Sequence, residues 1–217
     1  MARNKYPEKT IELILDTSKE LFLKNGYENT SIQDILENLK GLSKGAIYHH
    51  FKSKEAIFEA ISMREAEKNK IAFLQIKNNT NLNGADKLKE IIKFNITSEA
   101  TRNIIKLCPN LLDNPKFLSM ELKQMYDIFI PEFIVPIVEE GAKDGSIKTN
   151  KPYELAESIM LFINIWMNPL IFQDDIERLT NKFEMINEFF KPYQLELFDE
   201  DCKKHFIELQ KEKVVTE

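Results

Sequence analysis

The sequence predicts an all-α protein in which a small three-helix unit precedes a larger helical bundle. Apolar residues recur at helical spacing along most of the chain, and six glycines among 217 residues are too few for a loop-rich all-β fold. Capping residues and glycine or proline breaks fall where this periodicity stops. Because these separate signals agree, the helical assignment depends on no single one of them.

The first two helices are expected between residues 11 and 39. The apolar side of the first carries Ile11, Ile14, Leu15, Leu21 and Phe22. Gly26 should end it, because glycine readily takes the left-handed conformation found just past a helix end. Thr30 or Ser31 should cap the second helix. Thr30 and Gln33 also have capping-box spacing, so Gln33 has an alternative role at the helix end.

A tight turn at Gly41 separates the second helix from a third, very short one. Ser43 should cap this third helix, which extends to about His50, and Ser53 should cap a fourth that continues toward Phe73. Two short helices joined by a glycine turn form a helix-turn-helix arrangement.

The outer face of the third helix has the composition of a DNA-binding surface. Ile47 and Phe51 lie four residues apart and should anchor the helix inward. The opposite face carries a cation, a residue without a side chain, a phenol and an imidazole: Lys44, Gly45, Tyr48 and His49. The major groove of DNA is wide enough to admit such a helix.

Separate contacts can be assigned to phosphates and to bases. Lys44, Lys54 and Tyr48 are expected to contact phosphates, as is the start of the second helix near Ser31. We expect the bases to be contacted by Ser43, Lys44, Ala46 and His49. Gln33 is a further candidate if it does not serve the helix cap.

The adjacent histidines do not suggest a metal or a catalytic site. Neighbouring side chains project about 100° apart on a helix, so His49 and His50 are poorly placed to share one ion. His50 is expected to pack or to contact a phosphate. With no supporting ligands and no nucleophile–base pair, we expect no metal, no cofactor and no enzyme activity.

The segment FLKNGYENTSIQDILENLKGLSKGAIYHHFKSKEAIF resembles the N-terminal DNA-binding domain of the TetR family of bacterial transcriptional regulators. The matching positions are Phe22, Gly26, Tyr27, Thr30, Ser31, Ile32, Asp34, Ile35 and almost all of residues 41–55. The resemblance implies a recognition helix that starts at Ser43. It also implies DNA contacts at Ser31, Gln33, Ser43, Lys44, Gly45, Ala46, Tyr48, His49 and Lys54. The chain departs from the family pattern between Asp34 and Gly41, where Lys40 is one extra residue in the turn.

The remainder of the chain is expected to form a helical effector-binding and dimerisation domain. The resemblance suggests a division into residues 1–53 and 54–217, and a dimer interface formed by the helices predicted at 152–172 and 175–192. These two helices carry more apolar side chains than one core face needs: Ile159, Phe162, Ile163, Trp166, Phe183, Ile186, Phe189 and Phe190. A helix predicted from Pro115 to Lys143 should kink or split at Pro131 and Pro136.

A pocket between these helices is expected to take a small apolar or aromatic effector. The candidate lining residues are Phe94, Met120, Met125, Phe129, Phe133, Phe162 and Trp166. Aromatic residues and methionines at helical spacing are also typical of a simple core, so this alternative stays open.

Charge and composition favour a cytoplasmic protein that binds nucleic acid through its first part. The net charge is −5, yet residues 1–54 carry nine Lys or Arg against seven Asp or Glu. Only two distant cysteines occur, Cys108 and Cys202, which is typical of a reducing compartment. The most apolar run, residues 159–172, is too short to span a membrane and contains Asn164 and Asn168.

Together these observations predict a homodimeric transcriptional repressor that a small effector releases from an operator in double-stranded DNA. The alternative is a DNA-binding regulator whose C-terminal domain binds a protein partner. The operator, the effector and the regulated genes do not follow from the sequence.

Overall fold

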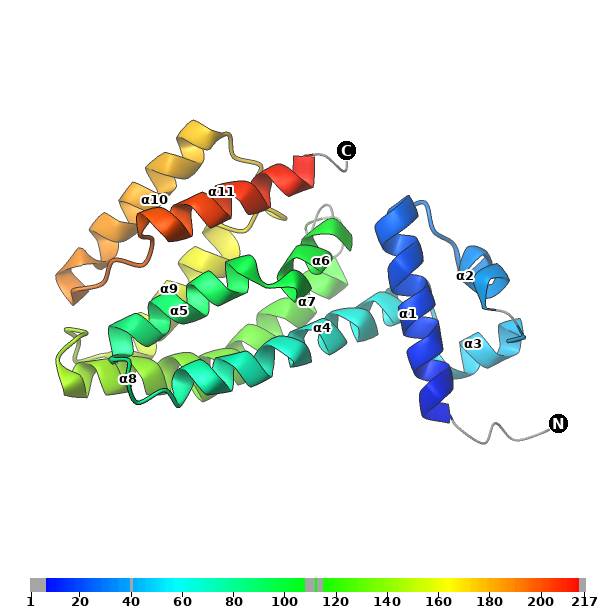
Figure 1. Cartoon of the computed structure of the whole chain (residues 1–217), viewed down its shortest axis with the longest axis horizontal. Coiled ribbons are helices and arrows are strands. Elements are labelled where there is room, and N and C mark those ends of the chain that lie inside the picture. The colour runs from blue at the N-terminus through cyan, green and yellow to red at the C-terminus, as the bar shows by residue number, and fades with distance from the viewer. Residues whose placement is uncertain (1–6, 40, 108–111, 113–114, 215–217) are drawn as a thin grey trace.

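A computed structural model describes residues 7–39, 41–107, 112 and 115–214, and it confirms an all-α fold (Figure 1). No strand occurs within these residues. The helices are α1 (Pro7–Asn25), α2 (Ile32–Asn38), α3 (Lys44–His50), α4 (Lys54–Lys77), α5 (Gly84–Thr97), α6 (Glu99–Leu107), α7 (Pro115–Gln124), α8 (Val135–Asp144), α9 (Pro152–Leu161), α10 (Ile176–Phe190) and α11 (Glu200–Val214).

The molecule divides into a small head and a larger body. The head consists of α1, α2, α3 and residues 54–61 at the start of α4, and the body contains the later helices (Figure 1). The head has a core of side chains with almost no solvent exposure: Ile14, Phe22, Ile35, Ile47, Ile57 and Phe58. Because α4 continues from the head along the body, one rigid element joins the two regions.

The helix ends of the head follow the predicted turn chemistry. Gly26 has a φ of 84° directly after α1, and Gly41 has a φ of 89° before α3. A residue with a β-carbon rarely adopts this left-handed conformation, so glycine permits the chain to reverse at both places. Ser43 and Ser53 each accept a hydrogen bond from the backbone N–H three residues later, which confirms them as N-caps.

The segment from residue 115 to 144 remains helical throughout, so the helix does not split at Pro131 and Pro136 but changes its winding there. A π-helix (Met125–Ile134) connects α7 directly to α8 and contains Pro131. Proline has no N–H to donate to a preceding carbonyl and its ring clashes with the carbonyl four residues earlier, so regular α winding is disfavoured at Pro131. Pro136 lies in the first turn of α8, where proline is tolerated.

The helix beginning at Pro152 ends earlier than the predicted residue 172. After α9, a short π-helix (Phe162–Trp166) completes the helical run, and a turn follows. Asn168 stabilises that turn, because its side chain accepts a hydrogen bond from the Leu170 N–H at 2.9 Å. None of the helices in the described parts of the chain combines the length and apolarity that a membrane crossing requires.

Candidate nucleic-acid interface

The start of α2 is fixed by a reciprocal pair of hydrogen bonds. The Ser31 hydroxyl accepts from the Asp34 N–H at 3.1 Å, while the Asp34 carboxylate accepts from the Ser31 N–H at 2.8 Å. Hydrogen bonds from the side chain and then the backbone of Ser31 hold the pKa of Asp34 below its ordinary value. An ionised carboxylate therefore caps the helix over a wide pH range.

This arrangement corrects the expected capping box between Thr30 and Gln33. Thr30 is 1% exposed, and its hydroxyl donates to the Gly26 carbonyl at 2.8 Å. The exposed Gln33 side chain instead donates to Glu37 at 3.0 Å, one helical turn further on. Gln33 therefore lies on the surface of α2 and serves no cap.

The helix α3 lies at the outer end of the head with one side buried. Ile47 has no solvent exposure and Phe51 is buried, so both residues anchor the helix to the head core as predicted. Lys44 and Tyr48 lie one turn apart on the other side, with the Lys44 ammonium 5.9 Å from the Tyr48 ring centroid. The seven residues of α3 thus have a buried face and a free face.

Most of the side chains predicted to contact DNA lie on this free face or on the start of α2. The exposed ones are Ser31, Gln33, Ser43, Lys44, Gly45, Tyr48 and His49. Ala46 is half-buried, in keeping with a small apolar surface at the edge of the face. The turn between the two helices contains Lys40, which lies outside the described residues.

Lys54 is half-buried and has protein partners at the base of α4. Its ammonium donates to the Tyr27 carbonyl at 2.8 Å and lies 4.1 Å from the centroid of the Tyr27 ring. An ammonium has three donors, so a phosphate contact is compatible with this geometry. These contacts nevertheless give Lys54 a role in joining α4 to the segment that follows α1.

The rings of His49 and His50 lie edge to face, with centroids 5.0 Å apart. His49 is exposed, whereas His50 is half-buried at the end of α3. Within the described residues, no group of three or more His, Cys, Asp or Glu side chains is arranged to hold a metal ion.

A row of aromatic rings connects the head to the body. Tyr27 contacts Phe22 and Phe58, with ring centroids 5.2 Å and 5.0 Å apart. Phe58 in turn lies 4.8 Å from Phe117 of α7 in an edge-to-face geometry. Because Phe58 and Phe117 are each 1% exposed, a displacement of α7 is felt directly by the head core.

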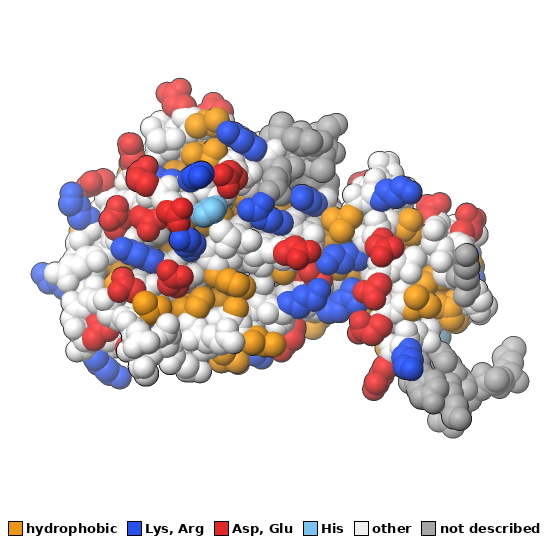
Figure 2. All heavy atoms as spheres, viewed as in Figure 1, with side chains coloured by type: hydrophobic (Ala, Val, Ile, Leu, Met, Phe, Trp, Pro, Cys, Tyr) orange, Lys and Arg blue, Asp and Glu red, His pale blue; other side chains and the backbone are white. Residues whose placement is uncertain are grey.

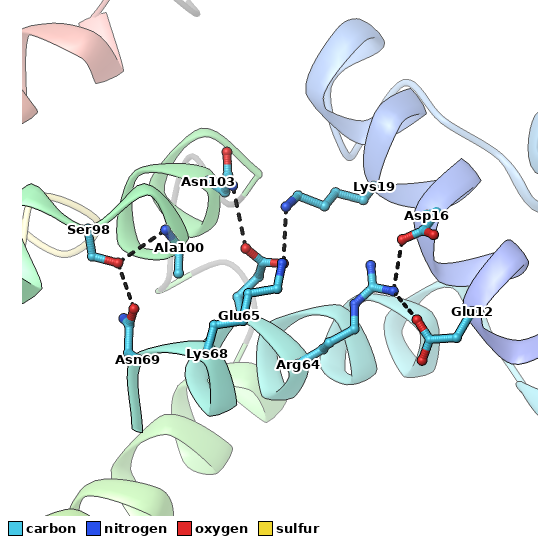
Figure 3. A network of polar contacts seen from close by, with 10 residues as sticks. All are labelled: Glu12, Asp16, Lys19, Arg64, Glu65, Lys68, Asn69, Ser98, Ala100 and Asn103. Atoms are coloured by element: carbon cyan, nitrogen blue, oxygen red, sulfur yellow. Dashed lines mark hydrogen bonds and ion pairs between the residues drawn. The ribbon is translucent and has the colours of Figure 1, made fainter. Parts of the chain in front are cut away.

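A buried carboxylate forms a second connection, and no sequence pattern predicted it (Figure 3). Glu65 of α4 is 1% exposed and pairs with Lys19 of α1 at 3.0 Å and Lys68 at 2.7 Å. Asn103 of α6 donates to the other carboxylate oxygen at 3.4 Å. Burial opposes ionisation, but the hydrogen bonds from Lys68 and Lys19 outweigh it, so the pKa of Glu65 lies below its ordinary value.

The junction between head and body is also the place where basic side chains gather on the face shown in Figure 2. Arg64 of α4 pairs with Glu12 at 2.8 Å and with Asp16 at 2.9 Å, both on α1. Over the rest of the body, acidic and basic side chains are mixed.

The body has a cavity of about 460 Å³ between α4, α5, α6, α7, the two π-helices, α9 and α11. Met125, Phe129 and Phe133, three of the seven candidate ligand-binding residues, line it. The other four candidates, Phe94, Met120, Phe162 and Trp166, are not among its lining residues. Phe94 packs against the outside of this wall, with its ring 5.5 Å from that of Phe73, and Phe162 packs on Phe189 at 4.9 Å.

Sequence reasoning missed the polar residues of the cavity wall, among them Glu121 of α7. Its position was detectable, because it interrupts an apolar series with spacings of three and four: Phe117, Leu118, Leu122 and Met125. A charged residue inside such a series is rarely buried without a reason.

Comparisons with known proteins agree with the geometry of the head. Residues 14–61 match the model of the family described as bacterial regulatory proteins, tetR family. The described elements within this match are most of α1, the helix-turn-helix of α2 and α3, and the start of α4.

Longer similarities extend into the body. The transcriptional regulator UidR of Escherichia coli is 25% identical over 168 residues, which cover 76% of this chain and 83% of UidR. An uncharacterized regulator of Bacillus subtilis, YuxN, is 32% identical over 113 residues; these cover 52% of this chain but only 34% of YuxN. The solved structure of Salmonella enterica GusR is 19% identical and superposes with a TM-score of 0.58, over 97% of this chain and 98% of that one.

Proposed function

The chain belongs to the tetR family of bacterial regulatory proteins through its N-terminal domain, and we propose that it is a homodimeric repressor released from its operator by a small effector. It is a DNA-binding transcriptional regulator by its family. The dimer, the operator contacts, the effector and an action in the cytoplasm belong to the proposal. Residues 1–53 are the proposed DNA-binding domain, and residues 54–217 the proposed effector and dimerisation domain.

The observation that carries the proposal is the free face of α3. Ser43, Lys44, Gly45, Tyr48 and His49 are exposed there, while Ile47 holds the helix from behind. Positive charge, hydroxyl donors and a glycine on one short capped helix match the requirements of a helix that enters the major groove. Ser31 and the free N–H groups at the start of α2 supply a second phosphate contact.

Fluorescence anisotropy tests this function directly. The full-length protein is titrated into labelled duplex DNA from upstream of its own gene, with a shuffled duplex of equal length as the control. We expect preferential binding to the upstream DNA and an affinity that falls steeply as salt concentration rises, because phosphate contacts release counterions. Equal binding to both duplexes, or binding that ignores salt, would contradict the proposal.

The proposed dimer interface is the outer side of α9 and α10. Half of the apolar side chains predicted for the interface are already buried within one subunit. These are Ile159, Phe183, Ile186 and Phe190, each at most 1% exposed. Other apolar side chains of this region are exposed instead: Tyr153, Leu161, Phe172, Ile176, Met185 and Phe189. Burial of this surface against a second copy would remove it from water and relate two α3 helices by a two-fold axis.

Sedimentation velocity tests the interface. The wild type is expected to sediment as a dimer, and a Met185→Glu, Phe189→Glu double variant as a folded monomer with weak operator binding. Met63→Glu, which places a charge on an exposed apolar position of α4, is the matched control and should leave the dimer intact.

The cavity supports an effector rather than a protein partner as the signal. Its volume of about 460 Å³ lies in the range of small-molecule sites, about 300–1,000 Å³. It also includes Glu65, Asn69 and Phe117, which belong to or adjoin the two connections between body and head. An effector that changes the position of α7 or α4 would therefore shift the population between binding-competent and incompetent dimers.

A further inference from the structure

The wall of the cavity contains one acidic side chain in an apolar setting, Glu121. It lies on α7 between Phe117 and Leu118 on one turn and Leu122 and Met125 on the next, and all five residues line the cavity. The side chain retains some accessible surface, as a group facing an open cavity must. Its position is that of an apolar wall residue, and its chemistry is that of an anion.

Glu121 has no hydrogen bond or ion pair with any residue that the structure describes. Burial alone, with no compensating charge, raises the pKa of its carboxyl group to about 7. By contrast, the other buried carboxylate of the cavity, Glu65, is compensated by Lys19 and Lys68. An isolated carboxyl group among apolar side chains costs stability, so its presence calls for a counterpart that arrives from outside.

The other titratable groups around the cavity all come from α4. They are Glu65, the exposed Glu67 and the half-buried Lys70, which is the only basic side chain among the described lining residues. The lining residues contributed by α5, α6, the π-helices, α9 and α11 include no titratable side chain within the described chain. Because burial is the sole cause of the raised pKa of Glu121, neither Lys70 nor another described group neutralises it.

Aromatic rings from α4 and from the π-helix after α7 form another part of the wall. The ring of Phe73 lies 4.9 Å from that of Phe129 and 6.1 Å from that of Phe133, and all three residues line the cavity. Phenyl rings accommodate alkyl or aryl groups, and their faces also attract positive charge. The wall thus offers apolar contacts to the body of a ligand and a carboxylate to its charge.

We propose that the effector is an amphiphilic organic cation, an ammonium compound whose alkyl or aryl part fills the cavity and whose positive charge pairs with Glu121. The proposal rests on the proposed function only in taking this cavity as the effector site. It names a ligand chemistry that neither the family nor the fold specifies.

The affinity for the cation should depend on pH, because Glu121 is partly protonated when no ligand is bound. Around pH 7 about half of the molecules carry a neutral carboxyl group, and a bound cation favours the ionised form. Below pH 7, binding must displace a proton, so the affinity for the cation falls by up to about ten-fold per pH unit. Above pH 8 the affinity should be constant.

Isothermal titration calorimetry with matched probes tests the proposal. The full-length protein is titrated with octyltrimethylammonium, 1-octanol and octanoate, which share the alkyl chain and differ in charge. We expect the cation to bind at least about ten-fold more tightly than the alcohol at pH 8, since charge-assisted contacts in a poorly solvated site contribute this much. Octanoate should bind most weakly.

Three variants locate the charge recognition. Glu121→Gln keeps the shape of the side chain and should reduce the preference for the cation over the alcohol to less than about three-fold. It should also abolish the pH dependence between pH 6 and 8. Glu67→Gln, at an exposed lining position, and Glu132→Gln, on the same helical run but outside the cavity lining, should retain both properties.

Three results would overturn the inference. These are equal binding of cation and alcohol by the wild type, undiminished cation preference in Glu121→Gln, and loss of the preference in Glu67→Gln alone. The pH series on the wild type needs no variant, so a folding defect does not obscure it.

Failure of this inference and failure of the proposed function give different results. If operator binding responds to another compound while the cation does not bind, the ligand chemistry is wrong and the regulator stands. If the cation binds through Glu121 but the operator complex is unaffected, the site is correct and effector release is wrong.

Discussion

The head and the body place their charged side chains in opposite ways. In the head, Lys44, Tyr48 and His49 stand on the outside of a short helix, and the core behind them contains no buried charged side chain among the described residues. In the body, Glu121 faces inward and interrupts the apolar side of a helix. A surface that must meet a polyanion needs only exposed cations on a rigid support, whereas a cavity gains charge specificity only by accepting a carboxyl group where apolar packing would be more stable.

The contrast also concerns the distance in sequence over which each site is assembled. The free face of α3 is made by seven consecutive residues and their cap. The cavity requires side chains from eight helical segments between residues 62 and 209. Local substitutions should therefore affect the head site individually, while the body site depends on how whole helices pack.

The largest expected effect concerns the contact that the two regions share. Phe58→Ala should lower the free energy of unfolding by about 3–5 kcal/mol, because it empties a fully buried ring site between Tyr27 and Phe117. Urea denaturation followed by circular dichroism measures the change. Leu74→Ala, at a 40% exposed position on the same helix, is the control and should change stability by less than about 1 kcal/mol. A loss of that small size in Phe58→Ala would mean that head and body are not joined through this ring.

The next effect tests whether the body tolerates its inward charge at a cost. Glu121→Gln should stabilise the ligand-free protein at pH 8 by about 1–3 kcal/mol, because the raised pKa means that ionising the carboxyl group opposes folding. The folded state binds the proton of Glu121 more tightly than the unfolded state does. The wild type therefore loses stability as pH rises from about 4.5 through 7. The gain of the variant should therefore be small near pH 5.

Thermal or urea unfolding of the two proteins across this pH range provides the measurement. Glu132→Gln, exposed on the same helical run, should show no pH-dependent difference from the wild type. If Glu121→Gln were destabilising at pH 8, the carboxylate would have a stabilising partner and the contrast between the regions would weaken.

A smaller effect is expected on the outer surface of the head. Lys44→Ala should weaken DNA binding by roughly 1 kcal/mol for all sequences and reduce the salt dependence by about one counterion, since one phosphate contact is lost. Anisotropy titrations at several salt concentrations measure both quantities. Lys148→Ala removes the same charge from an exposed position of the body and should leave DNA binding unchanged. Equal effects of the two variants would mean that Lys44 of α3 adds only to the overall positive charge and makes no specific phosphate contact.

The smallest effect distinguishes base readout from phosphate contact. His49→Ala should change the affinity for the operator and for single-base operator variants by unequal amounts, without altering the salt dependence at neutral pH. A competition assay over such variants measures this preference. A uniform loss over all variants would assign His49 to the phosphate contacts instead.

Local patterns made the head predictable. Caps at Ser43 and Ser53, breaks at Gly26 and Gly41 and the inward pair Ile47 and Phe51 follow from interactions between residues at most four apart. The exception is the cap of α2. Thr30 with Gln33 and Ser31 with Asp34 have the same spacing, and only the burial of Thr30 against the end of α1 selects the second pair.

The body was less predictable because several helix faces there are apolar at once. Helical spacing alone does not tell whether Phe129 or Phe162 turns toward the cavity, since both recur on apolar faces and both are half-buried. The inter-helix packing decides it: Phe129 meets Phe73 at the cavity, whereas Phe162 packs on Phe189 and Phe190. The charged position Glu121 carried the more useful signal, because a carboxylate within an apolar face is uncommon.

The π-helix between α7 and α8 makes the cavity wall sensitive to chain length as well as to composition. Ten residues wind more widely there than in an α-helix, so the residues after it are turned relative to those before it. Loss of a single residue in this stretch, with the winding otherwise unchanged, would rotate α7, with Phe117 and Glu121, by about 100° against α8. A one-residue deletion would thus exchange the wall presented to the effector without changing any side chain of the DNA-facing helix α3, although the contact of Phe117 with Phe58 in the head core would have to re-form. Chain length is in this way a short evolutionary route to a regulator with the same operator and a different signal.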